Sequence, residues 1–501
     1  MSRAFYPAES YADSKSGYHL LPFRFLRLNS AKELLVNEVG EFVIAESGTA
    51  QTLIKKRLTR GSEAYSTFKA KQFISDDSTS ALLDLLATKY RTKYSFIDGF
   101  TKLHIFVVTL RCDHSCHYCQ VSRQTADKKT YDMSFETAEK SVELMMRSPA
   151  RHITLELQGG EPLLAFDVIR HIVPLAKRRA ESLRKELDIV VTTNLANATD
   201  DILFYLRDEN IKVSTSLDGP AFIHNANRPR PGNNSYELTI KNIERARKIV
   251  GASKVAALMT TTQLSLDHPT EIIDEYVRQG FHSIFLRPLS PYGFAVKTKR
   301  KTGYQLGNFL DFYVKGLAHI LQINKKGYDL AEVYAKILLT KILTPYGTGF
   351  VDLQSPAGAG INVLVYNYDG DVYATDESRM LAEMGDHSFR LGNVQTHTHK
   401  DIFTGDPFLN LVSASCNQSL PGCSDCALQP YCGSDPIFNH ATQGDVIGHR
   451  PTSDFCRRNM EIIKHLFDLI SQQDSETMRI FFAWIQNSGL SEISKVAPSC
   501  D

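Results

Sequence analysis

The sequence has no excess of charge of either sign, because 57 Lys and Arg residues nearly balance 56 Asp and Glu residues and leave a formal net charge of +1. Surfaces that bind nucleic acid or an anionic membrane usually carry a clear positive excess. No apolar run approaches the roughly 20 residues that a membrane-spanning helix needs, and the N-terminus lacks a signal-peptide core. These absences predict a cytoplasmic protein that binds neither nucleic acid nor membrane.

Cysteine is scarce, with nine residues in a chain of 501. Eight of the nine fall into two spaced groups or at their margin. This grouping suits metal clusters in a reducing compartment better than disulfides. The length of the chain predicts about three domains.

The first group consists of Cys112, Cys116 and Cys119. Three soft thiolates on one tight loop can hold three irons of a [4Fe–4S] cube and leave the fourth iron open for another ligand. A tetrahedral zinc ion would need a fourth protein ligand, which His114 or His117 could supply. The spacing favours a cluster and leaves zinc as the alternative.

Apolar, β-branched runs alternate with helical periodicity around this loop. Strands are expected at 104–110, 152–158, 188–194, 212–217, 254–262 and 282–289. Helices are expected at 134–147, 166–181 and 235–250, with another from Pro269 to just before Gly280. Six βα units in series predict an α/β fold whose parallel sheet curls into a partial (βα)6 barrel of the TIM type. In such a fold the functional residues lie at the C-terminal ends of the strands.

Unusual residues follow these expected strands. Gly159, Gly160 and Glu161 come directly after the second strand. The glycines would let a ligand approach the backbone, and the glutamate could accept hydrogen bonds from an ammonium group. The next two strands end in Thr and Ser residues, whose hydroxyls could bond ribose or a carboxylate. Each segment alone would also fit an ordinary turn or strand end.

The Cys triplet and these strand ends together resemble the signature of radical S-adenosylmethionine (SAM) enzymes. In that family the amino and carboxylate groups of SAM chelate the open iron of the [4Fe–4S] cluster. The resemblance implies SAM-binding roles for Tyr118, Gly159, Gly160, Glu161, Ser216, Arg228 and Leu289. Tyr118 and Leu289 would pack on the adenine, and the loop of Glu161 would hold the amino group. Ser216 and Arg228 would contact SAM as in peptide-modifying members.

The second group contains Cys423, Cys426 and Cys432, which have the spacing C-x₂-C-x₅-C of a metal site with one ligand missing. It resembles the SPASM extension, an auxiliary-cluster domain of radical SAM enzymes that act on peptides. The resemblance implies that Cys456 completes a four-thiolate [4Fe–4S] cluster. Zinc remains the alternative, since four thiolates suit either metal.

Complete SPASM domains hold a second auxiliary cluster through cysteines that flank a β-hairpin. The hairpin expected at 361–375 has no cysteine at its flanks, and Pro436 stands where a further ligand would follow the triplet. One auxiliary cluster is therefore expected. Whether Cys416 or Cys500 ligates a cluster is left open.

Asp376 follows the second strand of the expected hairpin. In sulfatase-maturing relatives, an Asp in the matching place accepts the proton lost when the substrate radical is oxidised. The resemblance implies a catalytic role for Asp376, and a solvated turn residue is the alternative.

The first 99 residues precede the expected barrel. A β-hairpin turning at 38–40 is followed by expected helices at 49–58, 62–70 and 78–92. This winged-helix pattern resembles the PqqD-type domains that bind the leader of a precursor peptide by adding it as an extra strand. A purely structural cap is the alternative.

The expected domains are a PqqD-like peptide-recognition domain at 1–99, a radical SAM core at 100–320, a SPASM-like domain at 345–457 and C-terminal helices at 458–501. This combination, with the run Arg287 to Ala295, resembles the HxsB-type maturases of His-Xaa-Ser peptide systems.

The resemblance implies reductive cleavage of SAM to a 5′-deoxyadenosyl radical that modifies a side chain of a precursor peptide. The implied partners are that peptide and an electron donor such as flavodoxin or ferredoxin, and a second maturase of the same system is left open. The alternatives are a sulfatase-maturing, formylglycine-forming enzyme and a non-catalytic metal-binding regulator.

Overall fold

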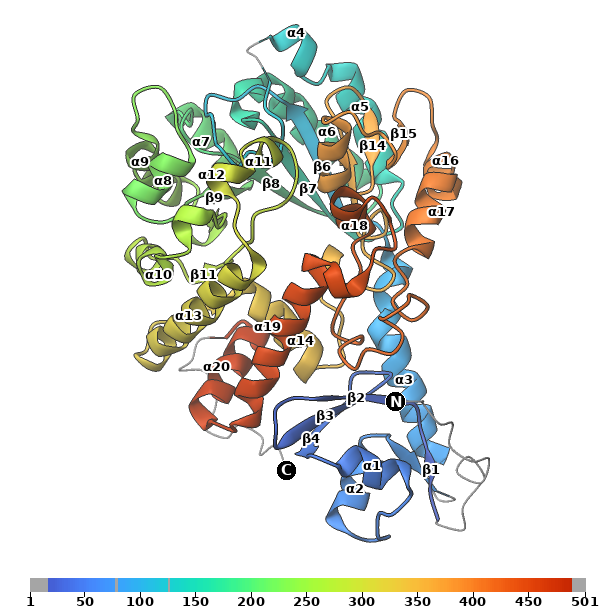
Figure 1. Ribbon diagram of the computed structural model, residues 1–501. Coiled ribbons are helices and arrows are strands. Elements are labelled where there is room, and N and C mark those ends of the chain that lie inside the picture. Colours follow the sequence, from blue (N-terminus) through green and yellow to red (C-terminus); the bar gives the residue numbers. More distant parts are fainter. Residues whose placement is uncertain (1–16, 77–79, 125–126, 489–501) are drawn as a thin grey trace.

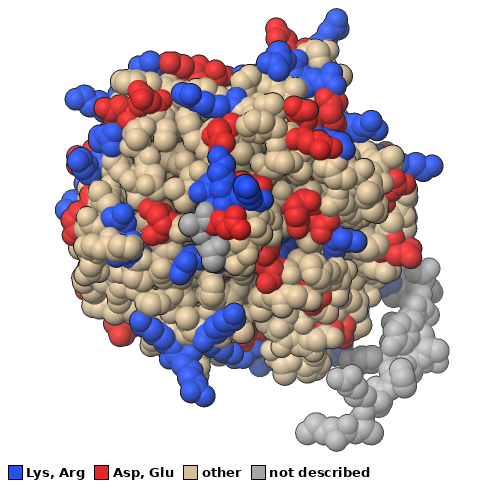
Figure 2. All heavy atoms as spheres, turned by 90° about the horizontal axis from the view of Figure 1, so that it is seen from above, with Lys and Arg blue, Asp and Glu red and all other residues tan. Residues whose placement is uncertain are grey.

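The computed structural model describes residues 17–76, 80–124 and 127–488 (Figure 1). The open question about Cys500 therefore lies outside the described residues. No helix within these ranges is both long enough and apolar enough to cross a membrane. Basic and acidic side chains are interspersed over most of the face in Figure 2, in keeping with the balanced composition.

One eight-stranded sheet has the strand order β10-β9-β8-β7-β6-β13-β14-β15. Its five consecutive parallel strands are β6 (Leu103–Thr109), β7 (His152–Gly159), β8 (Glu186–Thr192), β9 (Lys212–Ser216) and β10 (Val255–Leu258). The first four expected strands are confirmed within two residues at each end. The fifth is shorter than predicted. The cysteine loop leaves the C-terminal end of β6.

Helices cover the outer side of this sheet (Figure 1). They are α5 (Phe135–Met146), α6 (Phe166–Ser182), α7 (Asp200–Asp208), α9 (Ser235–Ile249) and α10 (Pro269–Arg278). In α6 the buried residues recur at helical spacing, as in Ile169, Ile172, Val173 and Ala176. Helix α10 begins with Pro269, where the missing N–H leaves no hydrogen bond unmade.

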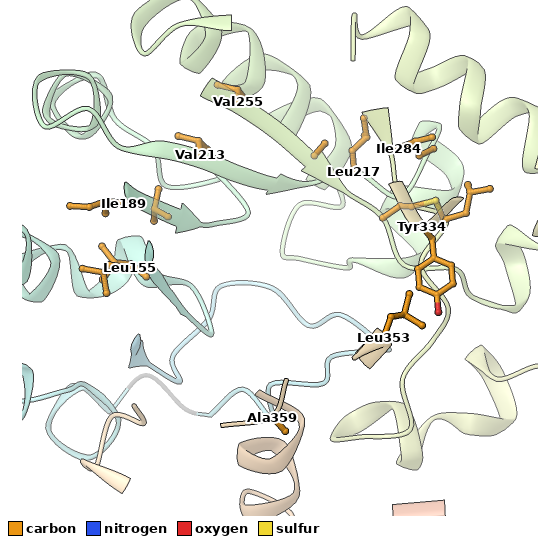
Figure 3. Close-up of a cluster of buried hydrophobic side chains, with 14 of the residues drawn as sticks. Leu155, Ile189, Val213, Leu217, Val255, Ile284, Tyr334, Leu353 and Ala359 are labelled. Carbon is orange, nitrogen blue, oxygen red and sulfur yellow. The ribbon is translucent and has the colours of Figure 1, made fainter. Parts of the chain in front are cut away.

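Successive strands contribute to one buried apolar layer. Leu155 of β7 pairs in register with Ile189 of β8, and Val213 of β9 pairs with Val255 of β10. Figure 3 shows these four side chains on neighbouring strands. All four are less than 10% exposed, so burial fixes the register of each strand against a one-residue slip.

The sixth expected strand, 282–289, is not part of the barrel sheet. Only β11 (Ser283–Ile284) is regular, and it pairs in parallel with β12 (Ala331–Glu332). The prediction of six βα strands in one sheet was therefore wrong for this segment. Its apolar residues are instead buried beneath α13 (Leu306–Lys325), whose Gly316 lies against Leu286 and Ile273.

The predicted hairpin is confirmed as β13 (Val363–Tyr366) and β14 (Asp371–Tyr373), followed by β15 (Arg390–Asn393). It does not stand apart from the barrel. Strand β13 pairs in parallel with β6, so that Val363 lies opposite Leu103. The hairpin thus extends the barrel sheet beside the strand that carries the cysteine loop.

The N-terminal region forms the predicted small α/β unit. Strands β2 (Phe23–Arg27), β3 (Lys32–Asn37) and β4 (Phe42–Glu46) make an antiparallel sheet, followed by α1 (Thr49–Ile54), α2 (Glu63–Ala70) and α3 (Ser80–Tyr94). The predicted turn at 38–40 is confirmed by the pairing of β3 with β4. Helix α3 runs from this unit toward the rest of the molecule (Figure 1).

The N-terminal sheet packs directly on the C-terminal region. The rings of Phe42 and Phe467 lie 5.1 Å apart, and the hydroxyl of Tyr431 donates to the carbonyl of Gly40 at 2.8 Å. Phe467 belongs to α19 (Asp454–Ser471), which packs on α13 and α14 (Val333–Leu343), as does α20 (Ser475–Gln486). These contacts hold the N-terminal sheet against the segment that contains the second cysteine group.

Candidate functional site

The loop with Cys112, Cys116 and Cys119 is held by backbone hydrogen bonds with three other segments of the chain. Its Arg111 carbonyl accepts from the amide of Glu161 at 2.7 Å, and the amide of His117 donates to the carbonyl of Asn227 at 3.1 Å. The carbonyl of Cys119 accepts from the amide of Phe294 at 2.8 Å. A loop held from three sides can keep three thiolates in place before any metal binds.

Gly159 and Gly160 allow this packing. A Cβ atom on Gly159 would lie 2.1 Å from the Thr109 carbonyl oxygen, and one on Gly160 would lie 2.3 Å from that of Arg111. From the sequence, a ligand was predicted to approach the backbone at these two glycines. In the structure, the backbone of the cysteine loop makes that approach, so the glycines join the ends of β6 and β7.

A third glycine of this kind was missed. Gly293 has φ +61°, and its Cβ would lie 2.4 Å from the Gln120 carbonyl oxygen and 2.8 Å from that of Cys119. It follows the Arg287 to Pro291 segment in the chain. A Gly-Phe pair in a long loop carries no sequence signal of its own, because the need for glycine arises only from this tertiary contact.

Glu161 is fully buried behind the cysteine loop. Its carboxylate accepts hydrogen bonds from the Thr193 hydroxyl at 2.5 Å, the Asn194 amide at 2.8 Å and the Leu163 amide at 3.1 Å. Burial raises the pKa of Glu161 to about 7, although these hydrogen bonds lower it. Glu161 therefore ties the end of β8 to the loop after β7, and contact with the SAM amino group stays a prediction.

Tyr118, Asp218 and Arg228 form a buried network behind the cysteine loop. The Tyr118 hydroxyl donates to Asp218 at 2.7 Å, and the Arg228 guanidinium donates to both oxygens of Asp218 at 3.0 and 3.2 Å. The same guanidinium lies 5.2 Å from the centre of the Tyr118 ring. Asp218 was not singled out from the sequence, although it is fully buried and joins the two predicted residues.

Ser216 and Leu289 lie at the same end of the barrel. Ser216 is the last residue of β9 and pairs with Leu258 of β10. The amide of Leu289 donates to the Tyr304 hydroxyl at 2.7 Å, and its side chain borders a cavity inside the barrel. The SAM contacts predicted for Ser216, Arg228 and Leu289 remain predictions.

The second cysteine group converges. Burial, followed by the charges of Cys432, Cys423 and Cys426, raises the pKa of Cys456 to about 12. These four thiols thus lie close enough to affect one another, although Cys456 comes from the start of α19. Cys416 is apart from them, with its thiol donating to the Val412 carbonyl at 3.4 Å.

Both donor sets fit iron–sulfur clusters in their chemistry. The first offers three thiols on one loop and the second offers four, and soft thiolates are the ligands of such clusters. Among the described residues, no group of His, Cys, Asp or Glu side chains has the convergence needed for a single metal ion. A cube binds each thiolate through a different iron and does not need that convergence.

A cavity of about 520 Å³ occupies the barrel interior beside these elements. Its walls include Glu156 and Gln158 of β7, Thr192 of β8 and the segment 285–290. The start of α15 (Asp376–Ala382) and the loop after Cys432 close another side. The cavity therefore lies between the ends of the barrel strands and the second cysteine group.

Asp376 borders this cavity. One of its carboxylate oxygens accepts from the Nε of Arg379 at 2.9 Å, and Arg379 is fully buried. This ion pair was not predicted, because Arg379 lies one helical turn farther on and no pattern distinguishes it from a surface arginine. The catalytic role of Asp376 stays a prediction.

A model of the radical SAM superfamily matches residues 106–275. This stretch contains the first cysteine group and the ends of β7, β8 and β9. Over residues 106–275 the chain is therefore similar to the radical SAM superfamily, which indicates that this part binds SAM and an iron–sulfur cluster.

The chain is also similar to the anaerobic sulfatase-maturating enzymes. The cysteine-type enzyme of Clostridium perfringens is 25% identical over 309 residues, which cover 58% of this chain and 77% of the relative. Uncharacterized proteins of Methanothermobacter thermautotrophicus and Methanocaldococcus jannaschii are 27% and 26% identical over 190 and 197 residues. The matched parts cover 38% and 39% of this chain, and 68% and 65% of the two relatives.

Solved structures share the fold. The enzyme anSMEcpe with bound AdoMet has a TM-score of 0.62 at 18% identity, covering 74% of this chain and 98% of its own. SuiB of Streptococcus suis, bound to the precursor peptide SuiA, has a TM-score of 0.52 at 14% identity and covers 87% of this chain and 99% of its own. The likeness to SuiB thus extends over more of the chain than the likeness to anSMEcpe.

The contacts of Glu161 lead to a prediction for Glu161→Gln. The amide would place an N–H group against one of the three donors that the carboxylate now satisfies. We expect SAM to bind roughly 10-fold to 100-fold more weakly, as for the loss of a hydrogen bond to a charged group. Equilibrium binding of SAM to the anaerobically reconstituted protein measures this.

Glu186→Gln is the matched control, because Glu186 begins the same strand β8 and its side chain is 64% exposed. Iron content should stay at the parental value in both variants, since neither residue supplies a thiolate. Parental SAM affinity in Glu161→Gln would contradict the placement of the SAM site at this loop.

Proposed function

We propose that this protein is a radical SAM maturase that modifies a side chain of a ribosomal precursor peptide, as in the HxsB-type His-Xaa-Ser systems. The observation that carries the proposal is the cavity inside the barrel, which is lined by Glu156, Gln158 and Thr192 of the barrel strands and by Asp435 of the loop after Cys432. Its volume of about 520 Å³ falls in the range of small-ligand pockets and would accept a peptide side chain.

The residues have distinct roles in this proposal. Cys112, Cys116 and Cys119 would hold the SAM-binding [4Fe–4S] cluster, and Cys423, Cys426, Cys432 and Cys456 one auxiliary [4Fe–4S] cluster. When bound, the first cluster supplies the electron that cleaves SAM to methionine and a 5′-deoxyadenosyl radical. The chain itself orients SAM through Glu161, Ser216 and Leu289, and it excludes water by enclosing the cavity.

The N-terminal unit would bind the leader of the precursor. Its three-stranded sheet has the order β2-β3-β4, so β2 and β4 are its edges. On β2 the side chain of Phe25 is 51% exposed. A leader added along such an edge would gain main-chain hydrogen bonds and an apolar contact.

Sulfatase maturation is the second candidate, favoured by the relative in Clostridium perfringens. The flanks of the hairpin argue for a different arrangement of clusters, because Ala357 and Ala374 stand there without any thiol nearby in sequence. The likeness of the fold to SuiB over 87% of the chain supports the precursor-peptide proposal.

The test uses the anaerobically reconstituted full chain with SAM and a reductant such as reduced flavodoxin. Short peptides encoded beside this gene, with and without their leaders, are compared with sulfatase peptides that carry Cys or Ser. We expect a mass change on a leader-bearing peptide and formation of 5′-deoxyadenosine in proportion. Modification of the sulfatase peptides alone would replace the proposal with the second candidate.

A further inference from the structure

The cavity inside the barrel carries an excess of acidic side chains. Its lining carboxylates are Glu156, Asp352, Asp376, Glu377 and Asp435, and its lining guanidiniums are Arg287 and Arg458. Asp376 is paired with Arg379, and Glu156 accepts from the Thr192 hydroxyl at 2.7 Å. The remaining three carboxylates, Asp352, Glu377 and Asp435, form the acidic cluster of the cavity.

The three carboxylates of the acidic cluster lie close enough to repel one another. Burial is the main cause that raises the pKa of Glu377 and of Asp435 above the usual values, and the neighbouring negative charges raise it further. Burial also raises the pKa of Asp352, while Arg458 and Arg287 lower it. The two arginines therefore offset only part of the cost of charging the cluster.

The position of the acidic cluster is fixed by backbone packing. A Cβ on Gly433 would lie 2.0 Å from the carbonyl oxygen of Asp352, so the loop after Cys432 rests directly on that backbone. The same loop ends in Asp435, whose carboxylate caps α18 (Pro436–Gln443) by accepting from the Phe438 amide at 2.9 Å. Two segments far apart in the sequence thus present their carboxylates to one space.

A second observation points to an absent ligand. The hydroxyl of Tyr292 borders the cavity, and the residue is only 1% exposed. It makes no hydrogen bond within the part of the chain that the structure describes. Burial, followed by the charges of Asp435, Glu377 and Asp352, raises the pKa of Tyr292 well above its usual value. A buried hydroxyl without a partner costs free energy that a polar ligand would recover.

We propose that this cavity binds a positively charged side chain of the peptide substrate, held by Asp352, Glu377 and Asp435 and by the Tyr292 hydroxyl. An ammonium, guanidinium or imidazolium group would neutralise the acidic cluster and give Tyr292 a hydrogen-bond partner. A bare metal ion fits less well, since no three of these carboxylates converge as ligands of one ion among the described residues. The inference rests on the proposed function in one respect, that the cationic group belongs to a peptide.

The experiment measures binding of single-residue probes, which need no turnover. The probes are the N-acetyl amides of Arg, Lys, His and Gln, titrated into the anaerobically reconstituted full chain with SAM present. We expect the three basic amides to bind more tightly than the Gln amide. Glu377→Gln and Asp435→Asn should each weaken that binding roughly 10-fold to 100-fold, because each removes a charged hydrogen-bond acceptor.

Two further variants keep the result interpretable. Glu461→Gln is the matched control, because Glu461 lies on α19 with its side chain 51% exposed and outside the cavity. Tyr292→Phe removes only the hydroxyl and should weaken the basic amides severalfold even if a carboxylate variant loses iron. Iron content and thermal melting are recorded for every variant.

Equal binding of the Gln and basic amides would overturn the inference, as would parental affinity in Glu377→Gln, Asp435→Asn and Tyr292→Phe. The proposed function is tested by separate outcomes. If the basic amides bind as expected but no precursor peptide is modified, the cation site stands and the peptide assignment falls. If precursors are modified regardless of their basic residues, the peptide assignment stands and the cation site falls.

Discussion

Replacing Cys112, Cys116 and Cys119 together with Ala is expected to abolish SAM cleavage entirely. The auxiliary cluster should remain, so that iron falls from about eight to about four per chain, since each cube holds four. The remaining cluster would have all four irons bound by thiolates and none open to SAM. Iron analysis and chromatographic detection of 5′-deoxyadenosine on the same sample measure both effects.

The loop contacts provide a check on this result. The three cysteines are partly buried on a loop whose backbone is already held by Glu161, Asn227 and Phe294, so the triple variant should fold and melt near the parental temperature. Formation of 5′-deoxyadenosine by the triple variant would contradict the assignment of this loop. Zinc in place of iron in the parental protein would contradict both cluster assignments.

Replacing Cys456 with Ala is expected to spare SAM cleavage but to abolish peptide modification. SAM cleavage without peptide should continue, because the first cysteine group is untouched. Iron should fall by about half, since the auxiliary cube would keep one iron without a protein ligand and would be lost more easily. Peptide modification should fall to background, because the loop after Cys432 that carries Asp435 would lose the anchor of the cluster.

Cys416→Ala is the matched control for this variant. Its thiol bonds only to the Val412 carbonyl among the described residues and does not join the other four thiols. Iron content and peptide modification should therefore match the parent. Loss of a cluster in Cys416→Ala would show that the fourth ligand had been assigned to the wrong cysteine.

Much of the barrel could be predicted from the sequence because its signals are local. The apolar runs of β6 to β9 and the helical spacing in α6 are properties of single segments. The segment 282–289 has the same composition as a strand, but it pairs with β12 rather than with β10. The strand with which residues 282–289 pair depends on how α13 packs over them, and the residues that determine this packing are distant in the sequence.

The candidate site was predicted in part for the same reason. The cysteine spacings are local, and the charges of Cys423, Cys426 and Cys432 raise the pKa of Cys456, so the four thiols lie near one another; their binding of one cluster stays a prediction. Asp218, Gly293, Arg379 and Tyr292 were missed, because each matters only through a partner elsewhere in the chain. The backbone contacts of Gly159 and Gly160 with Thr109 and Arg111 were also missed, and the approach of a ligand to these glycines stays a prediction.

The pairing of β13 with β6 has a consequence for biosynthesis. Strand β6 leads into the cysteine loop, yet one of its two neighbours begins only at Val363. While the ribosome is still making the intervening chain, β6 has an open edge on that side, and closing it requires a contact between distant parts of the sequence. The strand that leads into the first thiols therefore gains its full support only late in translation.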